Sequence, residues 1–285
     1  MKQRIFAALA VAVIGLASLA GCGQTDASAN PSSGSPAGSS QSGQEEAAGS
    51  LLDQIRQRGE IIIATEGTWA PWTYHDEADT LVGFDVEVAQ AVAEKLGVKA
   101  AFVEGEWDGL LAGLDAGRYD MMANGVDVTP DRQEAYEFTD PYAYNRTAVI
   151  VRLEDDSIHA LADLEGKSTA NTISSTYAQL AEEYGAQVTG VDDLNQTMEL
   201  LLAGRIDATL NSEVTFYDYL RAQPDAQVKI AALTDEATQV AFPVPKGEVE
   251  LAEAINEALN ELREDGTLAQ LSEKYFGSDI TQIPA

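Results

Sequence analysis

Short apolar runs alternate with amphipathic stretches along most of the chain, beginning near residue 60. The first apolar run reads as a buried strand, and the stretch after it places its apolar residues on one helical face. Asp85 is a natural N-cap for this helix, and Gly97 is a natural stop. Repeated pairs of this kind predict a parallel sheet with helices on both faces. The first set comprises strands at 61–64, 99–103 and 121–123 and helices at 86–96 and 107–116.

A second set of alternating elements begins after Tyr144, with Asp192 as the expected cap of its second helix. Two further helices end the chain and have no strands of their own to cover. We therefore expect them to return to the first sheet, so that the chain crosses twice between two lobes; two sequential domains are the alternative. The expected ranges are strands at 147–151, 168–172 and 207–210, helices at 175–184, 194–202, 250–262 and 268–276, a first lobe of 51–143 with 240–285, and a second lobe of 144–239.

The N-terminal segment has the pattern of a secretion signal. Two basic residues precede a short apolar run, which closes with small residues directly before Cys22, the only cysteine of the chain. Residues 1–21 are therefore predicted to be a signal peptide. Residues 23–49 contain no large apolar side chain and predict a flexible tether, so the linker is set at residues 22–50. The residues before Cys22 resemble the bacterial lipoprotein box, in which the cysteine carries lipid. An ordinary signal peptide with an incidental cysteine is the alternative.

Charge and motif content exclude several functional classes. The formal net charge of −30 argues against binding nucleic acid or anionic lipid through a basic surface. The two histidines fall in different predicted lobes, and no nucleophile elbow, zinc-protease motif, phosphate loop or dinucleotide fingerprint is present. We expect no catalytic residues, no metal and no cofactor.

A candidate anion site lies beyond the third predicted strand. Thr129 and Pro130 form a typical helix start, and Arg132 falls in its first turn. Ligands bind in crevices at the carboxyl ends of strands in such sheets. Free helix N–H groups together with a bidentate guanidinium suit a carboxylate. Pairing of Arg132 with a neighbouring surface carboxylate is an equally consistent interpretation.

Two other groups of residues point to the same cleft. Ser175 and Thr176 stand between a strand and a helix of the second lobe, where hydroxyl groups favour anions; simple helix capping is the alternative. Trp69, Trp72 and Trp107 all lie in strand-end loops of the first lobe. These positions favour pocket walls over core packing.

Several segments in order resemble the extracytoplasmic solute-binding proteins of polar amino-acid ABC importers, known as family 3. The likeness covers residues 51–277. It rests on the segments Ala64–Trp72, Gly83–Val88, Trp107–Leu110, Gly117–Asp120, Thr129–Arg132, Phe138–Tyr142, Ser174–Tyr177, Gly204–Ala208 and Asp265–Thr267.

The resemblance implies an α/β fold of the type II periplasmic-binding-protein kind, with two lobes joined by a two-crossing hinge. It implies that Arg132 clamps the carboxylate of a free amino acid, aided by backbone groups near Gly125 and Asp127 and by the Ser175–Thr176 loop. Trp69 and Trp72 would then stack on the ligand side chain.

One departure from the family leaves the partner of the ligand ammonium open. Many members place an aspartate where this chain has Ser212, which carries no charge. Glu213 and Asp127 are the candidates to replace it, and Glu66 is the candidate to receive a basic side chain.

The family also implies partners and a location. We expect a monomer that delivers a polar amino acid or cystine to an ABC permease and its ATPase, held at the outer face of the membrane by lipid on Cys22. An enzyme on the same fold, a dehydratase or a cell-wall lytic enzyme, is one alternative. A detached receptor that presents its ligand to a sensor is another.

Overall fold

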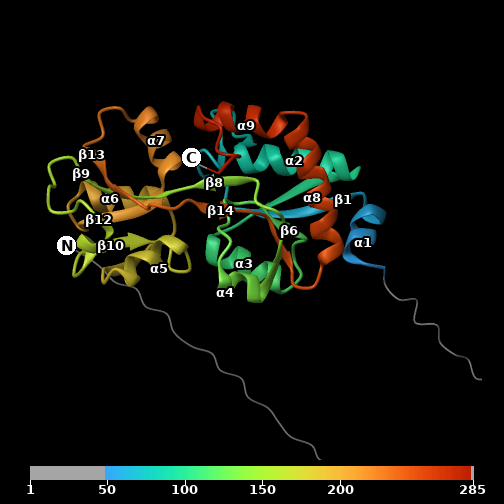
Figure 1. The fold of residues 1–285 in the computed structure, drawn as a ribbon, viewed down its shortest axis with the longest axis horizontal. Coiled ribbons are helices and arrows are strands. Elements are labelled where there is room, and N and C mark those ends of the chain that lie inside the picture. The colour runs from blue at the N-terminus through green and yellow to red at the C-terminus, as the bar shows by residue number, and fades with distance from the viewer. Residues whose placement is uncertain (1–48, 284–285) are drawn as a thin grey trace, which may run out of the picture. The chain divides into compact units, whose positions relative to one another are not determined.

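The computed structural model describes residues 49–283, so the predicted signal peptide, Cys22 and nearly all of the predicted linker lie outside the described residues. The described chain is organised around two larger sheets, each with helices on both faces (Figure 1). We call the part built on the first of these sheets the first lobe and the part built on the second the second lobe.

The sheet of the first lobe is parallel, as the sequence predicts, with the strand order β5-β1-β6. Successive side chains of a strand point to opposite faces. Ile63 and Met121 accordingly lie in one core cluster, whereas Ala64 and Met122 lie in another. The elements are α1 (Leu51–Arg58), β1 (Glu60–Thr65), β2 (Thr68–Trp69), β3 (Thr73–His75), β4 (Leu81–Val82), α2 (Phe84–Leu96), β5 (Lys99–Glu104), α3 (Trp107–Asp115), β6 (Met121–Met122), α4 (Pro130–Ala135), β7 (Tyr136–Phe138), β15 (Pro243–Pro245), α8 (Val249–Glu264) and α9 (Thr267–Phe276).

The C-terminal helices pack on the first lobe. Leu251 and Ile255 of α8 and Leu268 of α9 share a core cluster with Ile61 and Val88. Figure 1 shows α8 and α9 beside α2, far from the second-lobe sheet, although that sheet is nearer to them in sequence. The apolar face of each helix is therefore buried in the core of the first lobe.

The sheet of the second lobe is mixed rather than parallel, with the order β11-β10-β12-β9-β13. Strand β9 runs antiparallel to both of its neighbours. Strands β11 and β13 and helix α7 are additions to the sequence prediction. The elements are β9 (Thr147–Arg152), a 3-10 turn (Leu161–Leu164), β10 (Ser168–Asn171), α5 (Thr176–Glu183), β11 (Gln187–Gly190), α6 (Leu194–Leu202), β12 (Ala208–Ser212), α7 (Glu213–Ala222) and β13 (Val228–Leu233).

Two adjacent segments join the lobes. Strand β8 (Ala143–Asn145) leads out of the first lobe, and β14 (Thr238–Val240) leads back and pairs with it antiparallel. The returning strand also pairs with the loop after β6, through a bridge between Asp127 and Val240 and a hydrogen bond from Val128 N to Gln239 O of 2.8 Å. The predicted ligand loop is thus attached directly to the hinge.

Two predicted helix caps are wrong by one or two residues. Helix α2 begins at Phe84 with Gly83 as its N-cap, and Asp85 lies inside the first turn. Its buried carboxylate instead accepts hydrogen bonds from Gly125 N and from the Tyr142 hydroxyl. Asp193 rather than Asp192 caps α6 and accepts from Gln196 N at 2.9 Å. The prediction for Thr129 is confirmed, since its side chain accepts from Arg132 N with Pro130 at the first helical position.

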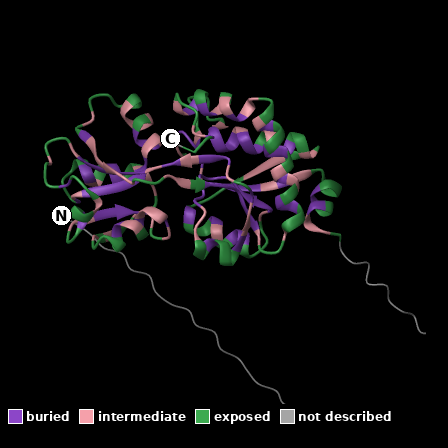
Figure 2. Ribbon diagram, in the orientation of Figure 1, coloured by how far each residue is buried: buried purple, intermediate pink, exposed green. Residues whose placement is uncertain are grey.

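Buried residues follow both sheets, while the outer faces of the helices are exposed (Figure 2). No helix within residues 49–283 combines the length and the apolar character that a membrane crossing requires.

Candidate functional site

A cavity lies between the two lobes and draws its walls from both. Its empty space, including the part that opens to solvent, is about 610 Å³. The lining comprises Glu66, Thr68, Trp69, Trp107, Gly125, Asp127 and Arg132 from the first lobe and Asn171, Thr172, Ser175, Thr176, Tyr177, Asp193, Leu194, Thr197 and Asn211 from the second. Eight of the ten predicted ligand residues are therefore brought together.

Arg132 projects from the first turn of α4 into this cavity and is only 9 % exposed. Its guanidinium donates to two carbonyl oxygens, that of Asp127 at 3.0 Å and that of Ser174 at 3.4 Å. It also lies 5.2 Å from the centre of the Trp107 ring. Burial lowers the pKa of this guanidinium. Within residues 49–283 it forms no salt bridge, which excludes the surface ion pair as its role here.

Asp127 lies five residues before Arg132 and is also buried. Its carboxylate accepts from the Thr176 hydroxyl of the second lobe at 2.5 Å and from the Thr238 hydroxyl of the hinge strand at 2.7 Å. Burial raises the pKa of Asp127, and these two hydroxyl groups partly oppose the rise. This first-lobe carboxylate therefore contacts both the second lobe and the hinge strand.

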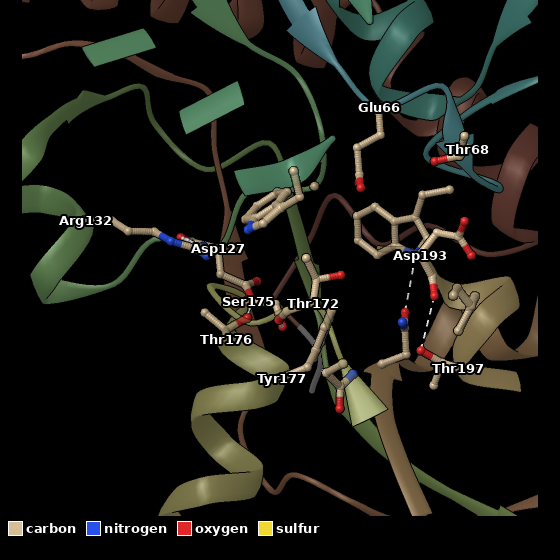
Figure 3. A pocket seen from close by; sticks show the side chains of 16 residues that line it. Glu66, Thr68, Asp127, Arg132, Thr172, Ser175, Thr176, Tyr177, Asp193 and Thr197 are labelled. Carbon is tan, nitrogen blue, oxygen red and sulfur yellow. Dashed lines mark hydrogen bonds between the residues drawn. The ribbon is translucent and has the colours of Figure 1, made fainter. Parts of the chain in front are cut away.

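Glu66 follows β1 and brings a third charged group to the cavity. Asn124 holds its carboxylate by donating from Nδ2 at 2.5 Å. Burial, opposed by the Asn124 hydrogen bond and aided by the nearby charges of Asp193 and Asp108, raises the pKa of Glu66 to about 7. Figure 3 shows Glu66 reaching into the cavity from the first lobe, apart from Arg132 and Asp127.

The Trp69 ring closes the cavity over Gly125. Gly125 has a φ of +54°, and a Cβ atom there would come within 2.6 Å of the Trp69 ring. Only glycine combines this backbone conformation with the close approach of the indole. The glycine therefore fixes the distance between the binding loop and the aromatic wall.

Two predicted ligand residues lie outside the cavity. Trp72 is 1 % exposed and stacks behind Trp69 in the core of the first lobe, with ring centres 5.6 Å apart. Glu213 forms a two-pronged ion pair with Arg146, at 2.9 and 3.0 Å. Its carboxylate is committed to Arg146 and does not line the cavity. Ser212, the aligned position, is the buried N-cap of α7.

Several lining residues of the second lobe escaped the sequence analysis. Asp193 and Thr197 share one side of the cavity, opposite Arg132 (Figure 3). Asn211 is the last residue but one of β12 and accepts from the Trp69 indole N–H at 3.3 Å. Asp193 and Thr197 come after the carboxyl end of β11, and Asn211 lies at the carboxyl end of β12. A position at the carboxyl end of a strand is the sequence feature that could have identified these residues. Strand β11, however, is too polar to recognise from the sequence.

Comparison with known proteins gives a consistent result. Residues 61–278 match the model of the bacterial extracellular solute-binding proteins, family 3. The L-cystine-binding protein TcyA of Bacillus subtilis is 37% identical over 99% of this chain and 100% of its own length. A probable amino-acid ABC transporter-binding protein of Haemophilus influenzae is 41% identical over 82% of this chain and 91% of its own length.

A solved structure, an ancestral arginine-binding protein bound to arginine, superposes with a TM-score of 0.73 at 36% identity and covers 77% of this chain and 99% of its own. The fold is therefore the type II periplasmic-binding-protein fold that the sequence predicted. The chain belongs to the bacterial extracellular solute-binding proteins of family 3.

Proposed function

We propose that this protein binds one free amino acid between its lobes and delivers it to the permease and ATPase of an ABC importer. The observation that carries the proposal is Arg132, a buried arginine that lines the cavity and whose guanidinium, among the described residues, donates only to carbonyl oxygens. A buried charge is costly unless it is paired. The planar guanidinium matches a carboxylate with two parallel hydrogen bonds. The ligand carboxylate is the partner that fits.

Asp127 is the best-placed partner for the ligand ammonium. Its two oxygens accept one hydroxyl each, whereas an ionised carboxylate has about four acceptor sites. Two sites therefore remain for an N–H donor. Arg132 and Asp127 lie side by side (Figure 3), as the carboxylate and ammonium of one α-amino acid require.

Glu66 narrows the ligand class. With Asp193, it adds negative charge to the cavity beyond what the main-chain groups of an α-amino acid neutralise. A second positive group at the far end of the ligand would compensate it. L-arginine carries a guanidinium there, and L-cystine carries a second ammonium beside a second carboxylate; relatives of this chain are named for binding each. We propose a ligand of this kind, bound by a monomer, since both lobes of the cavity come from one chain.

A thermal-shift screen of the twenty amino acids and L-cystine tests this function. A ligand at about 100 times its Kd stabilises a protein by about 2.7 kcal/mol. We expect large shifts with L-cystine or L-arginine and smaller ones with L-glutamine, which has a neutral far end. Mass spectrometry should recover the ligand unchanged. A screen in which no amino acid raises the melting temperature would overturn the proposal, and a chemically altered ligand would favour an enzyme.

Membership in an extracellular family places the protein outside the cytoplasm. We further propose that lipid on Cys22 holds it at the membrane, with residues 22–50 as tether; both lie outside the described residues except at the end of the tether. Replacing Cys22 with Ala should release the protein from the membrane fraction. Retention of Cys22→Ala in washed membranes would argue for an uncleaved signal or another anchor.

A further inference from the structure

Two stacked tryptophans of the first lobe donate hydrogen bonds to the second lobe. The Trp69 and Trp72 rings are inclined by only 19°. The Trp69 indole donates to Asn211 Oδ1 at 3.3 Å, and the Trp72 indole donates to Thr215 Oγ1 at 3.0 Å. Trp69 and Asn211 line the ligand cavity, whereas Trp72 and Thr215 do not. The second hydrogen bond therefore connects the lobes without reaching the ligand.

The surroundings of this second bond are closed to water. Trp72 and Thr215 are each 1 % exposed. Trp72 also packs on Phe84 and on Phe276, whose ring centres lie 5.8 and 5.0 Å from its own. An indole N–H buried in this way needs an acceptor, because an unmade hydrogen bond there carries the full cost of removing the group from water.

Helix α7 places its first turn between the two cores. Val214 packs against the core cluster of the first lobe, whereas Phe216, two residues later, lies in the core of the second lobe. Thr215 stands between them and faces Trp72. Separation of the lobes would draw Val214 and Thr215 away from the aromatic cluster and expose the Trp72 indole to water.

We propose that the Trp72–Thr215 hydrogen bond is a latch that stabilises the closed arrangement of the lobes and so determines how long a bound ligand stays. The proposal rests on the proposed function, since it assumes that the lobes close around an amino acid. In the open protein, water satisfies both groups. In the closed protein, each has only the other. Removal of the acceptor therefore penalises the closed form alone, and the apparent affinity follows the closed population.

Thr215→Val in the full chain tests the latch, because valine keeps the shape of threonine and removes the hydroxyl. Thr209→Val is the matched control: Thr209 is equally buried, but its hydroxyl donates to Ala170 O within the second lobe. Stopped-flow tryptophan fluorescence with L-cystine and with L-arginine gives the association and dissociation rates. For Thr215→Val we expect dissociation to be faster by roughly 5- to 100-fold, with association within about twofold of the unchanged protein.

The control should keep its dissociation rate even where it loses thermal stability, because its hydrogen bond lies within one lobe. Equal dissociation rates in Thr215→Val and the unchanged protein would overturn the latch. So would an equal acceleration in Thr209→Val, because general destabilisation would then explain it. If Thr215→Val does not fold, Trp72→Phe serves instead, since it keeps an aromatic ring in the cluster and removes the donor.

Hydrogen exchange of the Trp72 indole, followed by NMR, gives a measure that needs no ligand. The indole should exchange faster in Thr215→Val than in the unchanged protein, and Thr209→Val should show no change. Identical exchange in all three proteins would overturn the latch. If no amino acid binds the unchanged protein, the proposed function fails, and this exchange comparison alone then judges the latch.

Discussion

The two lobes contribute different chemistry to the same cavity. The first lobe supplies the charges Arg132, Asp127 and Glu66 and the rings of Trp69 and Trp107. The second lobe supplies mostly neutral hydroxyl and amide groups. Among its described residues that line the cavity, Asp193 alone carries a carboxylate, and this carboxylate already caps a helix. Charged hydrogen bonds are about twice as strong as neutral ones. The first lobe is thus equipped to capture a ligand, and the second to complete its enclosure.

The difference has a structural origin. Arg132 and Asp127 flank a rigid turn that the hinge strand and Thr129 hold in place. The second lobe instead directs two helix N-termini at the cleft, with Ser175 and Asp193 as the caps of α5 and α6. Groups of this second kind reach the ligand only when the lobes close.

The largest expected effect comes from removing the charge that is proposed to anchor the ligand. Arg132→Ala should weaken amino-acid binding by about 2–5 kcal/mol, roughly 30- to several-thousand-fold, because the ligand carboxylate would remain buried without its partner. Titration calorimetry measures this loss of affinity. Arg118→Ala is the control, since Arg118 is an exposed arginine of the same lobe. If Arg132→Ala bound the ligand as tightly as the unchanged protein, the first lobe would not capture the ligand through this charge, and the proposed difference between the lobes would be wrong.

Asp127→Asn should come next, with a loss well over tenfold, since asparagine keeps the shape and removes the charge that faces the ligand ammonium. A ligand analogue without the amino group should bind both proteins about equally. Glu213→Gln provides the contrast, because its carboxylate is committed to Arg146. If Glu213→Gln lost more affinity than Asp127→Asn, the ammonium site would belong to the second lobe.

The sequence predicted many of the elements, though not β11, β13 or α7, and it did not predict every direction of a side chain. Alternating strands and helices, the α4 cap and the placement of Arg132 follow from local patterns, and these are present. Trp69 and Trp72 are three residues apart in one loop, and no periodic pattern says which indole faces the cavity. Glu213 looked free because Arg146, its partner, is distant in sequence and meets it only through the packing of the second lobe.

Glu66→Gln should have opposite effects on the stability of the ligand-free protein and on its affinity for a cationic ligand. The pKa of Glu66 rises from an unfolded value of 4.5 to about 7 on folding. Between these values the folded protein holds more protons than the unfolded one, so its stability falls as pH rises through this window. At pH 8 Glu66→Gln should therefore raise the unfolding free energy of the ligand-free protein by about 1–3 kcal/mol, and the gain should shrink as pH falls toward 4.5.

The affinity of Glu66→Gln for L-arginine should fall at pH 8, although its stability rises. In the unchanged protein, binding of L-arginine should weaken below pH 7, because protonated Glu66 no longer attracts a cation. In Glu66→Gln it should be about tenfold weaker at pH 8 and nearly independent of pH from 8 to 5. Calorimetry across this range checks both. Matching pH profiles in the two proteins would place the distal cation elsewhere, with Asp193 as the next residue to replace.

The smallest effect should come from a neutral contact of the second lobe. The Thr176 hydroxyl donates to Asp127 at 2.5 Å only when the lobes are together. Thr176→Val should weaken binding by about 1 kcal/mol, roughly fivefold, because Asp127 keeps the Thr238 hydroxyl and the ligand ammonium as donors. The loss should lie in faster dissociation, since capture depends on the first lobe, and Thr176→Ser should restore it. A slower association in Thr176→Val would show that the second lobe takes part in capture, and the division of labour between the lobes would then be wrong.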